Sequence, residues 1–142
     1  MIQENKDLLL KDLCARLPYG VKVQFSLPNY NTNCFDDEIG EVFEIGDLFT
    51  HVHCKGIDYL PNTNRIKPYL RSMSSMTEEE CITLSKLIPY ETNVWKYIKT
   101  PIPLYIANIE QFDFFHSHHL DWRGLIQKGL ALEAPKNMYS NE

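Results

Sequence analysis

The residues best suited to chemistry are histidines close to an acid near the C-terminus. In His116-Ser117-His118-His119-Leu120-Asp121, three imidazoles and a carboxylate lie within six residues. These are side chains that zinc and other transition metals accept as ligands. The segment departs from the His-x-His-x-Asp-His pattern of metallo-hydrolases, because Leu120 and Asp121 stand where that pattern has Asp and His. We favour a structural interpretation, in which the imidazoles satisfy carbonyl groups at a helix end and Asp121 caps the next helix.

A second pair of histidines, His51 and His53, lies two residues apart on a predicted strand. Alternate residues of a strand share a face, so both rings could hold one metal ion if the C-terminal helices covered that face. A metal-dependent enzyme is therefore one alternative function, although we expect no cofactor. Its candidate ligands are His51, His53, His116, His118, His119 and Asp121.

A group of basic residues between positions 55 and 71 suggests a second alternative, a nucleic-acid-binding module. Tyr59 and Tyr69 are interleaved with these cations, and stacking rings beside basic groups are typical of such surfaces. An acidic run between positions 36 and 47 and a net charge of −5 argue against a polyanion as partner. The candidate contacts are Lys55, Arg65, Lys67 and Arg71.

Aromatic residues that we expect to be exposed, in stretches without clear periodicity, favour a protein as the partner. Tyr and Trp are enriched at protein interfaces. The sequence has no Gly-x-Ser-x-Gly turn, phosphate-binding loop or dinucleotide-binding glycine motif. We therefore expect a non-catalytic accessory or interaction protein. Its candidate contact residues are Tyr30, Trp95, Tyr97 and Tyr105.

The composition is that of an ordinary globular domain in a reducing compartment. The chain has 142 residues, of which 44% are hydrophobic and 23% charged. Acids near Met1 and the shortness of the Leu8-Leu9-Leu10 run argue against a signal peptide, and no apolar stretch approaches a membrane span. The four cysteines form no Cys-x-x-Cys pair and are expected to be buried thiols. These features favour a cytoplasmic protein.

The first half, residues 1–71, is expected to form a helix followed by a small antiparallel sheet. Leucines three or four residues apart predict the helix, and alternation of apolar and polar residues predicts the strands. Gly46-Asp47 is typical of a hairpin turn between two of these strands. The expected elements are a helix over 5–17 and strands over 21–27, 39–45, 48–55 and 66–70.

The second half, residues 72–142, is expected to be mainly helical. Thr77 and Glu80 form a capping box for a helix over 78–88. Further helices are predicted over 109–119 and over 122–128, the last capped by Asp121 and closed by Gly129. The whole chain is thus expected to be one α+β domain, with an SH3-like or open-barrel sheet and a helical C-terminal half packed on it.

Three segments of the sequence, residues 11–21, 66–80 and 118–133, resemble those of a known protein family, and together they span most of the chain. They include Ala15-Arg16-Leu17-Pro18-Tyr19-Gly20, Lys67-Pro68-Tyr69-Leu70-Arg71 and Leu120-Asp121-Trp122-Arg123-Gly124. In these segments the chain resembles a family of short uncharacterised proteins of gut anaerobic bacteria and their phages and mobile elements. Ser72 and Trp122 depart from the family pattern, which favours Pro and Tyr. The resemblance implies a prophage or mobile-element origin and no site residue.

Overall fold

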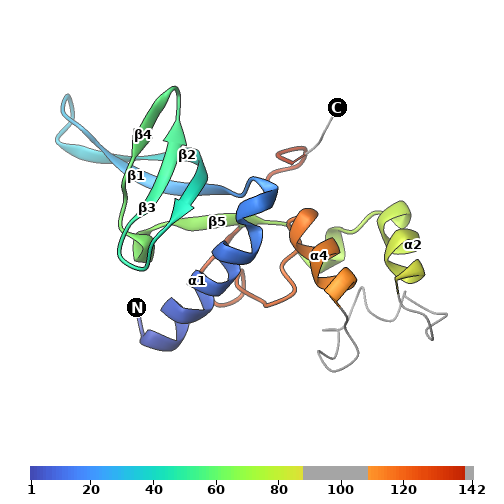
Figure 1. Ribbon diagram of the computed structural model, residues 1–142. Helices are drawn as coiled ribbons and strands as arrows, with labels where there is room; N and C mark the ends of the chain where they lie inside the picture. Colours follow the sequence, from blue (N-terminus) through green and yellow to red (C-terminus); the bar gives the residue numbers. More distant parts are fainter. Residues whose placement is uncertain (88–108, 140–142) are drawn as a thin grey trace.

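The computed structural model describes residues 1–87 and 109–139 (Figure 1). None of the helices in these ranges is both long and apolar enough to cross a membrane. The α-helices are α1 (Gln3–Arg16), α2 (Glu78–Lys86) and α4 (Ile109–Ser117). The strands are β1 (Lys22–Asn29), β2 (Cys34–Ile45), β3 (Thr50–Cys54), β4 (Ile57–Tyr59), β5 (Lys67–Leu70) and β6 (Leu132–Glu133), with short 3-10 turns at η1 (Leu17–Tyr19), η2 (Thr63–Arg65) and η3 (Met73–Ser75).

The strands form one open, mostly antiparallel sheet in the order β4-β3-β2-β1-β5-β6. The predicted N-terminal helix and antiparallel sheet are confirmed, and the chain reverses between β2 and β3 at the predicted hairpin. The last strand was not predicted. It pairs parallel to β5 through only Tyr69–Leu132 and Leu70–Glu133, a length too short to show a periodic pattern.

One face of the sheet packs on α1. Leu9 and Leu13 of the helix are buried with Val23, Phe25 and other alternating residues of β1, β2 and β3. At Gly40 of β2 a β-carbon would lie 2.9 Å from the His53 carbonyl oxygen and press on the Val52 side chain. Only glycine therefore allows these strands to approach so closely.

The structure corrects the predicted start of the second strand. The sequence predicted that this strand would begin at residue 39, because Asn29, Asn31 and Asn33 before it favour turns. Instead, β1 and β2 remain paired in register up to Asn29–Cys34, and only the residues between them form the turn. The polar segment is therefore the end of a long hairpin.

The described part of the second half has two nine-residue helices, turns and one short strand, so a mainly helical half is supported only in part. The predicted helix over 122–128 is wrong. Gly124 has a φ of 77°, in the left-handed region, which interrupts a right-handed helix. Asp121 nevertheless caps this turn, since its carboxylate accepts hydrogen bonds from the amides of Leu125 and Ile126 at 2.8 and 2.9 Å.

None of the four cysteines forms a disulfide. Cys54 and Cys81 are buried in the two main hydrophobic clusters, as expected. Cys14 and Cys34 are exposed, which corrects the prediction that they would be buried. Cys14 lies on the outer side of α1 and Cys34 next to the hairpin turn, where neither packs on the core.

A buried ionic cluster joins α1 to the C-terminal segment. Asp12 and Arg16 lie one helical turn apart, both fully buried, with Arg16 Nε donating to the Asp12 carboxylate at 2.8 Å. Arg16 Nη2 donates to the carbonyl of Leu120 at 2.7 Å, and Arg123 Nε lies 3.2 Å from the other Asp12 oxygen. One carboxylate thus holds two guanidinium groups from distant parts of the chain.

Replacing Arg16 with Ala is predicted to lower the free energy of unfolding by about 3–5 kcal/mol, because it removes one partner from a buried ion pair. Urea unfolding monitored by circular dichroism measures the change. Lys11→Ala is the matched control, since this exposed cation lies on the same helix and its removal should change stability by less than about 0.5 kcal/mol. A similar small effect of Arg16→Ala would contradict the role given to the cluster.

Candidate functional site

The histidines near the C-terminus have separate structural partners. His116 Nε2 accepts a hydrogen bond from the Trp122 indole at 3.0 Å. His118 Nδ1 donates to the Phe114 carbonyl at 2.9 Å, which is the helix-end role that the sequence predicted. His119 stacks on Tyr139, with ring centroids 3.6 Å apart.

The structure does not bring the candidate metal ligands together. His51 lies 3.3 Å from Glu44, and His53 is hydrogen-bonded to Asp58 at 2.7 Å, both on the far strands of the sheet. All six candidate ligands belong to the described residues, and in these residues no three His, Cys, Asp or Glu side chains are grouped to hold a metal ion.

Two of the four candidate nucleic-acid contacts are neutralised by acids. Lys55 Nζ lies 3.3 Å from the Glu38 carboxylate. Arg71 forms a bidentate ion pair with Glu80, with N–O distances of 2.6 and 2.8 Å. Arg65 and Lys67 are exposed around the start of β5. A basic patch reduced in this way offers little attraction for a phosphate backbone.

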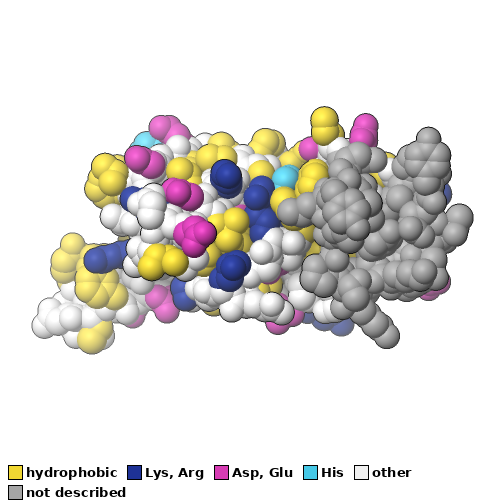
Figure 2. All heavy atoms as spheres, turned by 90° about the horizontal axis from the view of Figure 1, so that it is seen from below, with side chains coloured by type: hydrophobic (Ala, Val, Ile, Leu, Met, Phe, Trp, Pro, Cys, Tyr) yellow, Lys and Arg dark blue, Asp and Glu magenta, His cyan; other side chains and the backbone are white. Residues whose placement is uncertain are grey.

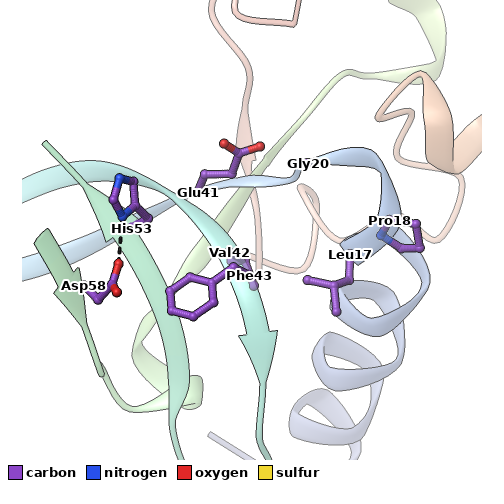
Figure 3. Close-up of a pocket in the computed structure, with 8 residues that line it drawn as sticks. All are labelled: Leu17, Pro18, Gly20, Glu41, Val42, Phe43, His53 and Asp58. Atoms are coloured by element: carbon purple, nitrogen blue, oxygen red, sulfur yellow. Dashed lines mark hydrogen bonds and ion pairs between the residues drawn. The ribbon is translucent and has the colours of Figure 1, made fainter. Parts of the chain in front are cut away.

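A groove of about 610 Å³ lies between the end of α1 and the far strands of the sheet (Figure 3). Leu17 and Pro18 line one side of it, and Phe43 lies on the other side. Two acidic residues, Glu41 and Asp58, also line the groove, and Asp58 is hydrogen-bonded to His53. This β2 groove, completed by Gly20 and Val42, therefore combines apolar walls with carboxylates.

The carboxylates of the β2 groove belong to a row of side chains across four strands. Glu41 is paired in register with Lys22 of β1 and with His53 of β3, and His53 is paired with Asp58 of β4. Directly opposed residues of neighbouring strands point to the same face. The row lies on the sheet face opposite to the buried Val23, Val42 and other core residues. At one end of the row Lys22 Nζ donates to the Met138 carbonyl, whereas Glu41, His53 and Asp58 are exposed.

The hairpin formed by β1 and β2 projects beyond the neighbouring strands (Figure 1). Strand β3 pairs with β2 only between Glu41 and Ile45, so residues 26–37 pair with one another alone; we call them the β1–β2 arm. Tyr30 and Phe35 near its tip are 87% and 72% exposed. The exposure predicted for Tyr30 is confirmed, whereas Trp95, Tyr97 and Tyr105 lie outside the described residues.

Apolar and acidic residues alternate along the outer face of β2. Phe35, Ile39 and Phe43 are all about half exposed or more, and Asp37 and Glu41 lie between them. Figure 2 shows hydrophobic patches beside acidic and basic side chains over the end of the molecule that holds the sheet. Sequence reasoning missed this stripe, although its alternation from residue 35 to 43 was the available signal.

Comparisons with protein-family models, with curated proteins and with solved structures found no match.

Stability is predicted to depend on pH through two buried histidines. Burial and the nearby Arg16 lower the pKa of His116 and of His119 from 6.5 to about 4. Between pH 4 and pH 6.5 these histidines are therefore more often protonated in the unfolded chain than in the folded one. The free energy of unfolding should thus fall as the pH decreases from 6.5 toward 4, by up to about 1.4 kcal/mol per pH unit for each histidine.

Urea unfolding at a series of pH values measures this dependence. The variant His116→Gln keeps an acceptor for the Trp122 indole and removes one titrating ring, so it should reduce the slope by about half. A free energy of unfolding that stays constant over the same pH range would show that these rings are not held neutral by the fold.

Proposed function

We propose that this protein is a non-catalytic accessory protein that binds another protein through the β1–β2 arm and the outer face of β2. The observation that carries the proposal is the exposure of Tyr30 and Phe35 on a projecting hairpin. Large aromatic side chains exposed together are costly in water and are typical of interface hot spots.

The partner surface that fits this region is positively charged. From residue 23 to residue 54 the sequence has no Lys or Arg, whereas Asp36, Asp37, Glu38, Glu41, Glu44 and Asp47 all lie in that range. Lys55 offsets only Glu38 by an ion pair. Complementary charge raises the association rate and selects the partner, while the aromatic groups supply most of the affinity.

The β2 groove extends this surface toward α1. Its apolar walls at Leu17 and Phe43 suit the aliphatic part of a lysine or arginine side chain, and Glu41 suits the charged end. We propose in addition that the protein acts in the cytoplasm and that it has a prophage or mobile-element origin. We also propose that the sheet is of the SH3-like or open-barrel type and that a helical second half packs on it.

The test compares the wild-type protein with Tyr30→Ser/Phe35→Ser in affinity capture from native lysate. Loss of hot-spot aromatics costs about 2 kcal/mol or more, so partner binding should weaken at least about 30-fold. Ile109→Ser is the matched control, because Ile109 is 76% exposed on α4, away from the arm. Both variants should keep the wild-type stability, since the replaced side chains are exposed.

The bound protein should be basic, and its retention should decrease as salt rises. The charge-reversed variant Asp36→Lys/Asp37→Lys should weaken it further without loss of folding. Equal capture by the wild-type protein and the double serine variant, or retention that is insensitive to salt, would overturn the proposal.

A further inference from the structure

The outer edge of β2 is unpaired along the β1–β2 arm. Strand β3 pairs with β2 only from Glu41 onward, and no other strand of residues 1–87 and 109–139 lies beside residues 34–39 on that side. These residues are exposed except for Glu38, which is partly buried. An unpaired strand edge presents a row of backbone N–H and C=O groups to which another extended chain can bind.

The register of the arm shows which residues of β2 direct their backbone groups to this edge. Val42 N donates to the Val21 carbonyl at 3.1 Å, and β1 and β2 then stay in the same register down to the turn. In an antiparallel pair, the backbone groups of successive residues point alternately toward the partner strand and away from it. Even-numbered residues of β2 up to Val42 therefore face β1. The residues whose N–H and C=O groups face the free edge are Phe35, Asp37 and Ile39.

The other edge of the arm is interrupted by a proline. Strand β5 pairs with β1 only at residues 23 and 24, so β1 also has a free edge farther along the arm. Even-numbered residues of β1 face outward, as Lys22 shows, because its N–H donates to the Tyr139 hydroxyl and not to β2. The outward-facing residues of the arm are thus Ser26 and Pro28. Pro28 has no N–H and breaks the row of donors, a common protection of strand edges.

The side chains along the β2 edge favour a basic occupant. Asp36 and Asp37 are exposed, and in the described residues their carboxylates accept hydrogen bonds from neutral side chains of β1. Glu38, the next residue, lies beside Lys55. A strand added to this edge would therefore meet acids at three successive positions.

The same charges argue against a second copy of this chain as the occupant. Pairing two arms edge to edge would bring their acids together, and like charges on paired strands destabilise the pair. The acids are flanked by the exposed apolar side chains of Phe35 and Ile39. The complementary segment has lysine or arginine at its centre and an apolar residue on each side.

We propose that the partner of the arm adds an extended basic segment as a further strand to the outer edge of β2. Its backbone pairs with the free N–H and C=O groups of Phe35, Asp37 and Ile39, which supply much of the affinity, while its basic side chains supply specificity. The inference rests on the proposed function, since it states how a protein partner contacts the same arm.

The probe is the peptide Thr-Val-Lys-Lys-Lys-Val-Thr with both ends capped. Its sequence reads the same in both directions, so it suits a parallel and an antiparallel addition equally. Two control peptides keep every side chain and carry N-methyl groups, one on each alternate set of residues. Because a strand directs only one of these sets toward β2, one control should lose binding and the other should keep it.

Amide hydrogen exchange measured by NMR reports the backbone pairing directly. At a peptide concentration about ten times Kd, exchange of the Phe35, Asp37 and Ile39 amides should slow about tenfold, because these amides become hydrogen-bonded only in the complex. The amides of Asp36 and Glu38 already face β1 and should change little.

Asp37→Pro removes the N–H at the middle of the free edge, and Pro28 shows that the arm accepts proline at an outward-facing position. The matched control is Asp37→Ala, which loses the same charge and keeps the N–H. Asp37→Pro should bind the unmodified peptide at least about fivefold more weakly than Asp37→Ala. If the proline variant fails to fold, the methylated peptides and the exchange of the wild-type amides still decide.

Equal binding of all the peptides, or unchanged exchange at Phe35, Asp37 and Ile39 in the complex, would overturn strand addition and leave the arm as a surface contacted through side chains. Absence of binding at millimolar peptide would also overturn it, and lysate capture with the double serine variant then decides separately whether the arm binds a protein. Protection of these amides in the free protein that grows with protein concentration would identify a second copy as the occupant and overturn the proposal.

Discussion

The arrangement of the two halves depends on one buried carboxylate shared by two guanidinium groups. Asp12 holds Arg16 on its own helix and Arg123 from the C-terminal segment, and Arg16 also binds the Leu120 carbonyl. Burial of these charges is expensive and is tolerated only when each has its partner in place. The cluster therefore fixes where α1 lies between the sheet and α4 (Figure 1).

The position of α1 determines which surfaces remain available. The helix covers one face of the sheet, where Val23 and Phe25 pack on it. On the other face, Met138 and Tyr139 contact Lys22 of β1, whereas Glu41 and Phe43 of β2 are exposed. The β1–β2 arm extends from that sheet without a neighbouring strand, so Tyr30 and Phe35 have nothing in the described residues to bury them. Together with burial, the positive charge of Arg16 lowers the pKa of the His119 ring.

Local patterns predicted the elements well where one face of an element is apolar. The α1 leucines and the alternation over 21–27 predicted elements close to those observed, and the Thr77 capping box is present in the structure. The prediction failed where local propensity was misleading. Asn-rich residues near 29–33 indicated a loop although cross-strand pairing continues to the turn, and Gly124 prevents the helix that Asp121 appeared to start.

The contacts that position the C-terminal segment join residues far apart in the sequence, which limits what a single sequence can predict. Arg123 reaches Asp12, and Tyr139 reaches His119, only after folding. The most direct test of the account is photo-crosslinking of the folded protein in its host cell, with a photoreactive phenylalanine analogue at residue 30 or at residue 109. The account predicts crosslinks to a basic protein from residue 30 and not from residue 109. Crosslinks from both positions alike, or none from residue 30, would contradict it.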